Sequence, residues 1–180
     1  MANKKNIVRR IKSAVISVSD KSNLKPLLQT LNRYNVKLIS SGGTFKAIRK
    51  LGYRCLEVSD YTGFNEILDG RVKTLHPKIH AGILNKRNNN SHKREIKKNN
   101  FQNIDLVIVN FYPFEKTLNT TKNHNKIIEK IDIGGPALVR SAAKNYNDVA
   151  VITSTNQYSA LIDQLKRFKG ATKLEFRKKL

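Results

Sequence analysis

Two short segments of this chain carry residue types that suit an anion such as a phosphate group. SVSDK (17–21) contains two serines and a lysine, and SSGGT (40–44) contains two glycines flanked by hydroxyl groups. Glycines let a ligand approach the main chain closely, and a helix that begins after them offers unpaired N–H groups and the positive end of its dipole. The glycines could equally serve a tight turn between a strand and a helix. We predict a two-walled phosphate seat formed by Ser17, Val18, Ser19, Lys21, Ser41, Gly42, Gly43 and Thr44.

The segment DGRVKTLHPKIHAG (69–82) is a second candidate, because it reads as a long loop crowded with basic side chains. Loops of this kind on a rigid scaffold are often functional, although a solvated basic loop is the plain alternative. A metal site is less favoured, since a proline between the two histidines opposes one helix carrying both, and no adjacent carboxylates complete a ligand set. The basic residues are Arg71, Lys73, His76, Lys78 and His80.

The segment NFYPF (110–114) follows the most apolar run of the chain, IDLVIVNF. A tyrosine there can donate a hydrogen bond at the rim of a sheet, and Asn110 can bind a polar ring. Phe111 and Phe114 could simply pack under a loop. Tyr112 is therefore the residue that we expect to act on a ligand.

The segment IDIGGPALVRSAAKN (131–145) joins an acid to a glycine pair and a proline at a plausible first helical position. The N–H groups from Ile133 to Gly135 could stabilise a developing oxyanion. Asp132 lies beside them, and Lys144 could pair with it only if the fold brings the two together. The alternatives are that Asp132 caps the helix and that Lys144 is a surface lysine.

Hydrophobic patterning predicts the elements that would position these segments. Strands alternate with helices, which implies a mostly parallel sheet covered on both faces. Ligands bind such sheets beyond the carboxyl ends of the strands, so the segments that follow the first four expected strands should meet at one rim: SVSDK (17–21), SSGGT (40–44), SDYTGF (59–64) and NFYPF (110–114). The expected strands are 11–18, 36–40, 54–58, 104–111 and 148–153. The expected helices are 24–31 (with a cap at 19–20), 44–51, 91–98, 125–131, 136–145 and 157–168, and 59–84 should hold loops and short helices.

The length, net charge, apolar runs and cysteine content of the chain limit the classes of protein to which it can belong. The 180 residues suffice for one domain with a real core. The net charge of +22 is spread over surface segments without interleaved aromatics, so nucleic acid is not an expected partner. No apolar run approaches the roughly 20 residues that a membrane span needs, and a single cysteine favours a cytoplasmic protein.

Taken together, these segments closely resemble the IMP cyclohydrolase domain of the bifunctional purine biosynthesis proteins. The resemblance is carried by five segments in this order: SVSDK, SSGGT, EVSDYTGFNEILDGRVKTLHPKIHAGIL, IDLVIVNFYPF and IDIGGPALVRSAAKN. The resemblance covers essentially the whole chain, and the long block around DGRVKTLHPK is its most specific part. It implies an α/β, methylglyoxal-synthase-like domain of three layers. It also implies closure of the purine ring of a formylated ribotide to inosine monophosphate (IMP), with loss of water and without a cofactor or metal.

The resemblance assigns roles to matching positions of this chain. The phosphate would bind the seat described above. Other substrate contacts would come from Arg71, Thr74, Asn110, Phe111, Ile133, Gly134 and Gly135. The catalytic group would be Lys73, Tyr112, Asp132 and Lys144.

The sequence also predicts where the domain ends, and it leaves three other functions open. We expect the domain to span 1–168 and residues 169–180 to begin a connection to a formyltransferase domain, whose activity this chain should lack. A fragment and a stand-alone enzyme both remain open, and a homodimer, usual in the family, is possible. The rivals are methylglyoxal synthase, a regulatory phosphate-binding module and a nucleic-acid binder recognised by charge alone.

Overall fold

The structure, a computed structural model, describes residues 8–111 and 114–180. Its centre is a five-stranded sheet in the order β4-β3-β2-β5-β6, in which every pairing of neighbours is parallel. The sheet strands are β2 (Ser13–Val18), β3 (Lys37–Ser40), β4 (Leu56–Glu57), β5 (Leu106–Asn110) and β6 (Ala150–Ile152). The expected α/β architecture with a central parallel sheet is confirmed.

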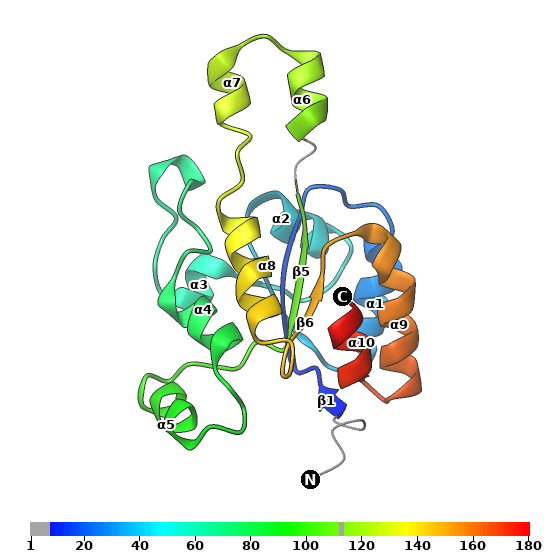
Figure 1. The fold of residues 1–180 in the computed structure, drawn as a ribbon. Helices are drawn as coiled ribbons and strands as arrows, with labels where there is room; N and C mark the ends of the chain where they lie inside the picture. The colour runs from blue at the N-terminus through cyan, green and yellow to red at the C-terminus, as the bar shows by residue number, and fades with distance from the viewer. Residues whose placement is uncertain (1–7, 112–113) are drawn as a thin grey trace.

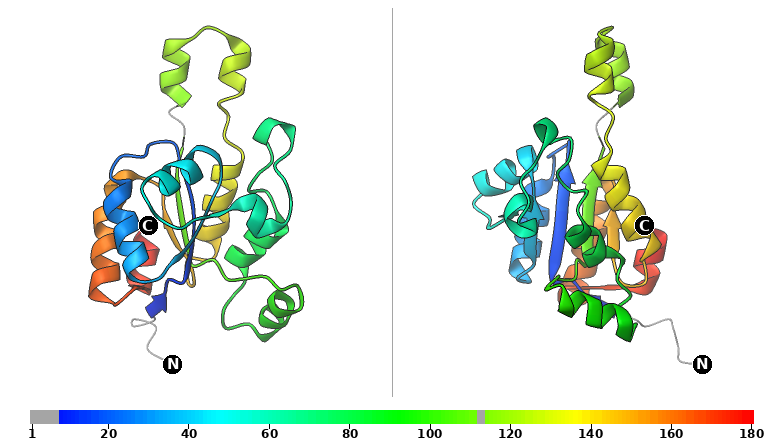
Figure 2. Two further views of the ribbon diagram at one scale, coloured as in Figure 1. Left: turned by 180° about the vertical axis from the view of Figure 1, so that it is seen from behind. Right: turned by 90° about the vertical axis from the view of Figure 1, so that its left-hand side faces the viewer.

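Helices cover both faces of this sheet and make three layers (Figures 1 and 2). Side chains of a strand point alternately to opposite faces, so neighbouring residues of β2 enter different cores. Ile16 packs in the cluster that contains Leu28 of α1 and Leu161 of α9. Val15 packs in the other cluster, with residues of α4 and α8 such as Leu138. The helices are α1 (Leu24–Arg33), α2 (Gly42–Lys50), α3 (Val58–Thr62), α4 (Pro77–Leu84), α5 (Asn90–Lys98), α8 (Gly134–Lys144) and α9 (Tyr158–Arg167), with 3-10 turns η2 (Leu68–Gly70) and η3 (Thr155–Gln157).

Several local expectations were wrong in detail. The helix α1 begins after Asn23, which has a left-handed φ of 56° and makes no side-chain capping bond, rather than after a cap at 19–20. Asp20 instead accepts a hydrogen bond from the N–H of Ser22, at 2.8 Å. The segment read as a long loop, 69–82, includes most of α4, because Pro77 starts that helix at its first position, where a proline is tolerated.

The end of the chain packs on the same body. β7 (Ala171–Lys173) pairs antiparallel with β1 (Val8–Arg10), and α10 (Leu174–Lys179) follows it. Arg177 of α10 is almost fully buried and donates hydrogen bonds to the carbonyl oxygens of Tyr146 and Asn147. Residues 169–180, where we expected a connection to begin, are thus held by the domain.

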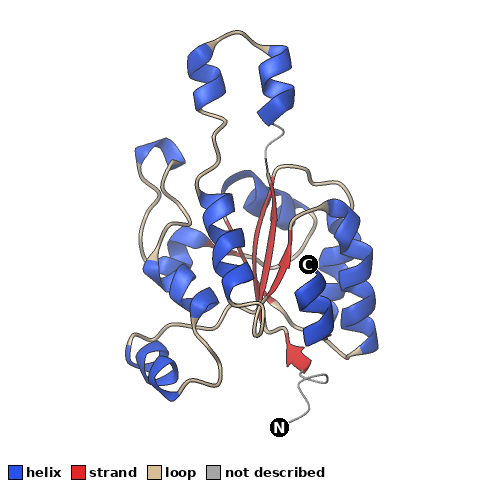
Figure 3. Ribbon diagram, viewed as in Figure 1, coloured by secondary structure: helices blue, strands red, loops and turns tan. Residues whose placement is uncertain are grey.

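A helical hairpin projects from the body at the carboxyl end of β5 (Figures 1 and 3). It consists of α6 (Phe114–Thr120) and α7 (His124–Ile128). The chain returns from α7 to the N-terminus of α8, at the same edge of the sheet. The hairpin and the loop before α4 frame the edge at which the predicted ligand segments end.

Candidate functional site

A cleft of about 550 Å³ lies at the carboxyl ends of β2, β3 and β5. It is the place where a parallel sheet presents its ligand site. The N-termini of α2 and α8 open into it, and so do the loop before α4 and the root of the hairpin. The residues lining it include Ser17, Val18, Ser19, Lys21, Ser41, Gly42, Gly43, Thr44, Arg71, Lys73, Thr74, Asn110, Asp132, Ile133, Gly134 and Gly135.

The two segments that we predicted as a phosphate seat form adjoining walls of this cleft. Gly42 starts α2 with a φ of +53°, a conformation that glycine adopts without strain. The ammonium group of Lys21 lies 4.0 Å from the position that a Cβ on Gly43 would occupy. Main-chain N–H groups of a helix start and a lysine therefore face the same space, as an anion site requires.

One residue of the predicted seat, Thr44, and one residue predicted to contact the base, Asn110, are already hydrogen-bonded to the protein. The Thr44 hydroxyl accepts from the N–H of Val18 at 3.1 Å and donates to its carbonyl oxygen at 3.0 Å. The Asn110 carboxamide accepts from the N–H groups of Ser19, at 2.6 Å, and Asp20, at 2.9 Å. It also donates to the carbonyl oxygen of Asp20, at 2.8 Å. Both side chains thus fix the shape of the first wall.

The loop before α4 brings two cations to the opposite side of the cleft. The ammonium group of Lys73 forms an ion pair with Glu66 at 3.3 Å and lies 3.4 Å from a Cβ position on Gly42, across the cleft floor. Arg71 pairs through two nitrogens with both carboxylate oxygens of Glu129. This pairing raises the pKa of Arg71 and lowers the pKa of Glu129. Each of these two cations is thus paired with an acid of the protein.

Asp132 lies at the start of α8 and caps it. Its Oδ1 accepts a hydrogen bond from the N–H of Gly135 at 2.9 Å. A Cβ on Gly135 would lie 2.3 Å from Oδ2 of this carboxylate, and one on Gly134 would lie 2.6 Å from the Thr74 hydroxyl oxygen. The glycine pair therefore allows the carboxylate and the loop before α4 to approach the helix end closely.

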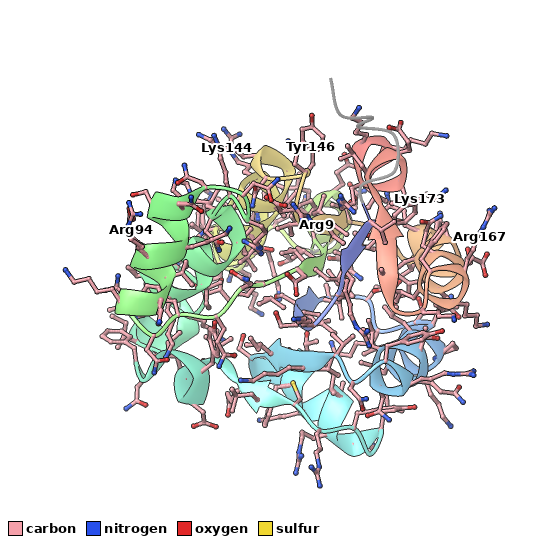
Figure 4. The ribbon with its side chains drawn as sticks, turned by 90° about the horizontal axis from the view of Figure 1, so that it is seen from below. Arg9, Arg94, Lys144, Tyr146, Arg167 and Lys173 are labelled. Atoms are coloured by element: carbon pink, nitrogen blue, oxygen red, sulfur yellow. The ribbon has the colours of Figure 1, made fainter. Side chains whose placement is uncertain are left out.

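The structure does not bring Lys144 to this cleft. Lys144 is the last residue of α8, whereas the cleft lies at the first, about 15 Å away along a helix of 1.5 Å rise per residue. Figure 4 labels the Lys144 side chain in a view from below, and Figure 1 shows that the C-terminal end of α8, where Lys144 lies, is away from the hairpin. That distance exceeds the reach of a lysine side chain. The expected pair of Asp132 and Lys144 within one chain was wrong for this reason.

The two aromatic predictions have different outcomes. Phe111 is described and is 44% exposed, but it does not line the cleft. Tyr112 lies outside the described residues, so its role stays a prediction.

The sequence analysis did not identify Glu66 and Glu129 as the acids that pair with the cations of the cleft. It also did not identify the apolar residues at the root of the hairpin. Glu129, Ile128 and Ile131 all line the cleft. Their only signal in the sequence was their place immediately before Asp132. A solitary glutamate in a strongly basic chain resembles a solvated surface residue, which is why it was passed over.

Among the described residues, no feature supports metal binding or insertion into a membrane. No group of three or more His, Cys, Asp or Glu side chains there is placed to hold a metal ion. His76 caps α4 through its Nδ1, which accepts from the N–H of Lys78, whereas His80 points to Ser141. None of the described helices combines the length and apolar character needed to cross a bilayer.

Comparison with known families identifies the fold. The MGS-like domain family matches residues 23–137, which is more than half of the chain. The chain belongs to the MGS-like domain family. The AICARFT/IMPCHase bienzyme family matches residues 142–180 of this MGS-like domain.

Two named relatives and one solved structure are similar to this chain over 90% or more of its length. The bifunctional purine biosynthesis protein PurH of Bradyrhizobium diazoefficiens is 48% identical over 96% of this chain and 32% of its own length. The PurH of Acetivibrio thermocellus is 48% identical over 90% of this chain and 32% of its own. The crystal structure of ForH superposes with a TM-score of 0.82 at 32% identity, covering 94% of this chain and 89% of that one. The MGS-like domain thus spans about a third of the length of these curated relatives.

Proposed function

We propose that this MGS-like domain is an IMP cyclohydrolase, which closes the ring of 5-formamido-1-(5-phosphoribosyl)imidazole-4-carboxamide to IMP, the last step of de novo purine biosynthesis. The observation that carries the proposal is a single cleft in which an anion seat faces Lys73 and Asp132. The similarity to relatives named bifunctional purine biosynthesis protein PurH adds support. The seat would hold the 5′-phosphate and leave the base to extend toward α8.

The chemistry asks for a base and for stabilisation of an oxyanion. The carboxamide nitrogen attacks the formyl carbon and loses one proton, and the formyl oxygen becomes a hydroxyl group. That hydroxyl then leaves with a proton from a ring nitrogen as water. The free Oδ2 of Asp132 is the natural acceptor of the amide proton. The ammonium group of Lys73 and the N–H groups of Ile133 and Gly134, at the start of α8, would stabilise the negative charge that develops on the formyl oxygen.

Positioning of the substrate also contributes, because both reacting groups belong to one molecule and must be held in the reactive rotamer. The formyl group must rotate until its carbon faces the carboxamide nitrogen. A cleft that binds the phosphate at one end and the base at the other can hold this rotamer, and effective molarities for well-oriented reactions are large. The mechanism that we propose needs no cofactor or metal, and it does not use Lys144.

Turnover by the purified chain tests the proposal. The chain is given the formylated ribotide without folate, and IMP formation is followed by ultraviolet absorbance. The informative variant is Asp132→Asn, because asparagine still caps a helix but cannot accept the amide proton. We expect turnover by the wild type and a kcat lower by about 10²–10⁴-fold in the variant, with IMP binding retained. Binding of IMP without wild-type turnover would instead favour a regulatory phosphate-binding module.

We also propose that the domain forms a homodimer in the cytoplasm and binds no nucleic acid. Large apolar side chains are exposed on the hairpin and around the cleft, and such patches on a soluble protein usually mark an interface. Sedimentation analysis should give the mass of a dimer. A monomer at all concentrations would refute this part. The exposed residues are Phe64, Ile67, Leu68, Leu75, Phe111, Phe114, Leu118, Ile128, Ile131 and Ile133.

A further inference from the structure

His76 occupies the position that caps the N-terminus of α4, where Ser, Thr, Asp or Asn is the usual residue. Its Nδ1 accepts a hydrogen bond from the N–H of Lys78 at 3.1 Å. Its backbone is extended, as a residue before a proline favours, and Pro77 starts the helix. An asparagine could make the same capping bond, so the cap alone does not require a histidine.

The ring of His76 has a second contact, which the usual capping residues cannot make. Its centroid lies 6.0 Å from the centroid of the Phe64 ring, and the two planes are tilted by 38°. This separation falls within the range of about 4.5–7 Å that is typical of attractive aromatic pairs. Phe64 directly follows Gly63, which terminates α3 with a φ of 75°. The ring pair thus joins the end of α3 to the start of α4.

The loop between these two rings, residues 65–75, carries Arg71 and Lys73 of the cleft. Its tip is closed on itself, because the N–H of Ile67 donates to the carbonyl oxygen of Val72 at 3.3 Å and the N–H of Val72 donates back to Ile67 at 3.4 Å. Arg71 lies inside this tip and Lys73 follows it directly. A closed tip of this kind changes position as a unit, so its place at the cleft depends on how the two ends of the loop are held.

Both ends of the loop are held at His76. At the C-terminal end, the N–H of His76 donates to the carbonyl oxygen of Thr74 at 2.9 Å, and Thr74 is buried. At the N-terminal end, the N–H of Phe64 donates to the hydroxyl oxygen of Thr62 at 3.2 Å, which fixes its backbone on α3. The ring pair then fixes that end of the loop against the start of α4.

We propose that His76 is a positioning residue, whose ring closes the loop 65–75 at its base and thereby sets Lys73 at the cleft. His76 does not line the cleft, so it acts through the loop. The ion pair of Arg71 with Glu129 also ties the loop to the hairpin, but both side chains are more than half exposed, and such pairs contribute little. The inference rests on the proposed function for its effect on turnover, whereas its effect on the loop does not.

Two substitutions of His76 separate the cap from the ring contact. Asparagine keeps the capping bond and loses the ring, whereas phenylalanine keeps a ring and loses the capping atom. Amide hydrogen exchange over residues 65–75 should be about two- to tenfold faster in His76→Asn, the range that the energy of an aromatic pair gives, and near the wild-type rate in His76→Phe. Exchange over residues 78–80, at the start of α4, should show the reverse. Unchanged exchange of the loop in His76→Asn, or equal acceleration in both variants, would overturn the positioning role.

Phe64 supplies the other half of the test. Phe64→Leu keeps the apolar bulk and loses the ring, so exchange over residues 65–75 should be faster by a similar factor. Adding this substitution to His76→Asn should have little further effect, because both break the same contact. Additive effects would mean that the two side chains act separately, which contradicts the ring pair.

Turnover, counted per IMP-binding site so that a smaller folded fraction does not contribute, gives the functional readout. Because misplacement by about 1 Å can cost about a hundredfold in rate, we expect His76→Asn to lower kcat about tenfold and His76→Phe to stay within about threefold of the wild type. A normal kcat in His76→Asn would show that the ring does not set Lys73.

The matched control is His92→Asn. The Nδ1 of His92 also accepts from a backbone N–H, that of Lys86 at 3.0 Å, and it lies on α5 away from the cleft. Its turnover and the exchange of residues 65–75 should equal those of the wild type. If the wild type shows no turnover, the proposed function fails, and the exchange rates alone still decide the role of His76.

Discussion

Asn110 offers a direct test of whether the cleft residues bind the ligand or shape its walls. Sequence reasoning placed Asn110 against the base of the ligand, but in the structure its carboxamide makes three hydrogen bonds to the backbone of Ser19 and Asp20. Those residues belong to the first wall of the phosphate seat. Asn110→Ala should therefore loosen that wall and weaken the binding of any ligand with a phosphate group.

The magnitude follows from the three bonds. Each hydrogen bond contributes a net free energy of about 0.5–1.5 kcal/mol, so the set contributes roughly 1.5–4.5 kcal/mol to the order of the loop. The loop is partly exposed, and water can replace some of the lost partners, which favours the lower end of the range. A cost of about 1.5 kcal/mol on binding corresponds to about a tenfold increase in Kd.

The assay compares two ligands by calorimetry. Ribose 5-phosphate has no base, whereas IMP has both the phosphate and the base. If Asn110 acts through the wall, Asn110→Ala weakens both ligands about equally, by about tenfold. If Asn110 binds the base, only IMP is weakened, and that result would refute the reasoning. Asn89→Ala is the matched control, because Asn89 accepts from the N–H groups of Ser91 and His92 on α5, away from the cleft.

Three further predictions concern single sites. Gly135→Ala should lower the free energy of unfolding by about 1–3 kcal/mol, because its Cβ would lie 2.3 Å from the capping carboxylate. Gly43→Ala is the comparison, since the nearest atom to its Cβ lies at 4.0 Å, and thermal unfolding should show a smaller loss of stability in this variant. Glu129→Gln should strengthen ribose 5-phosphate binding at low salt and lose this gain at high salt, since it removes an acid from the cleft and frees Arg71; weaker binding would contradict this. Burial raises the pKa of the Cys55 thiol to about 12, so its proton stabilises the fold below the ordinary pKa of about 9, and this stability is lost as pH rises through about 12. Alkaline unfolding should accordingly begin at a higher pH in Cys55→Ala.

The sheet and the location of the cleft could be predicted because both follow from local pattern. The runs that became β2 and β5 are apolar on both faces, as a central parallel strand requires. Once the strands are known, the rule that ligands bind beyond their carboxyl ends brings 17–21, 41–44 and Asn110 to one edge. No long-range contact had to be known for that step.

The roles of individual side chains could not be predicted in the same way, because they depend on contacts between distant segments. Asn110 binds a loop 90 to 91 positions earlier in the chain, and nothing near it in the sequence indicates that partner. The Lys144 error is different. A helix expected over 136–145 already separates its ends by more than 10 Å at about 1.5 Å per residue, so the predicted helix itself argued against the predicted pair.

The polar groups of the cleft divide into those that are engaged within the protein and those that a ligand can recruit. Thr44, Asn110 and Oδ1 of Asp132 hold the backbone in place. Lys73 instead pairs with Glu66, whose side chain is 55% exposed, and exposed ion pairs contribute little to stability. Exchange of that carboxylate for the negative charge of a bound ligand therefore costs little. The groups that keep the walls rigid and the cation that can change partners are thus different residues, which lets the cleft stay preorganised while one of its charges responds to the substrate.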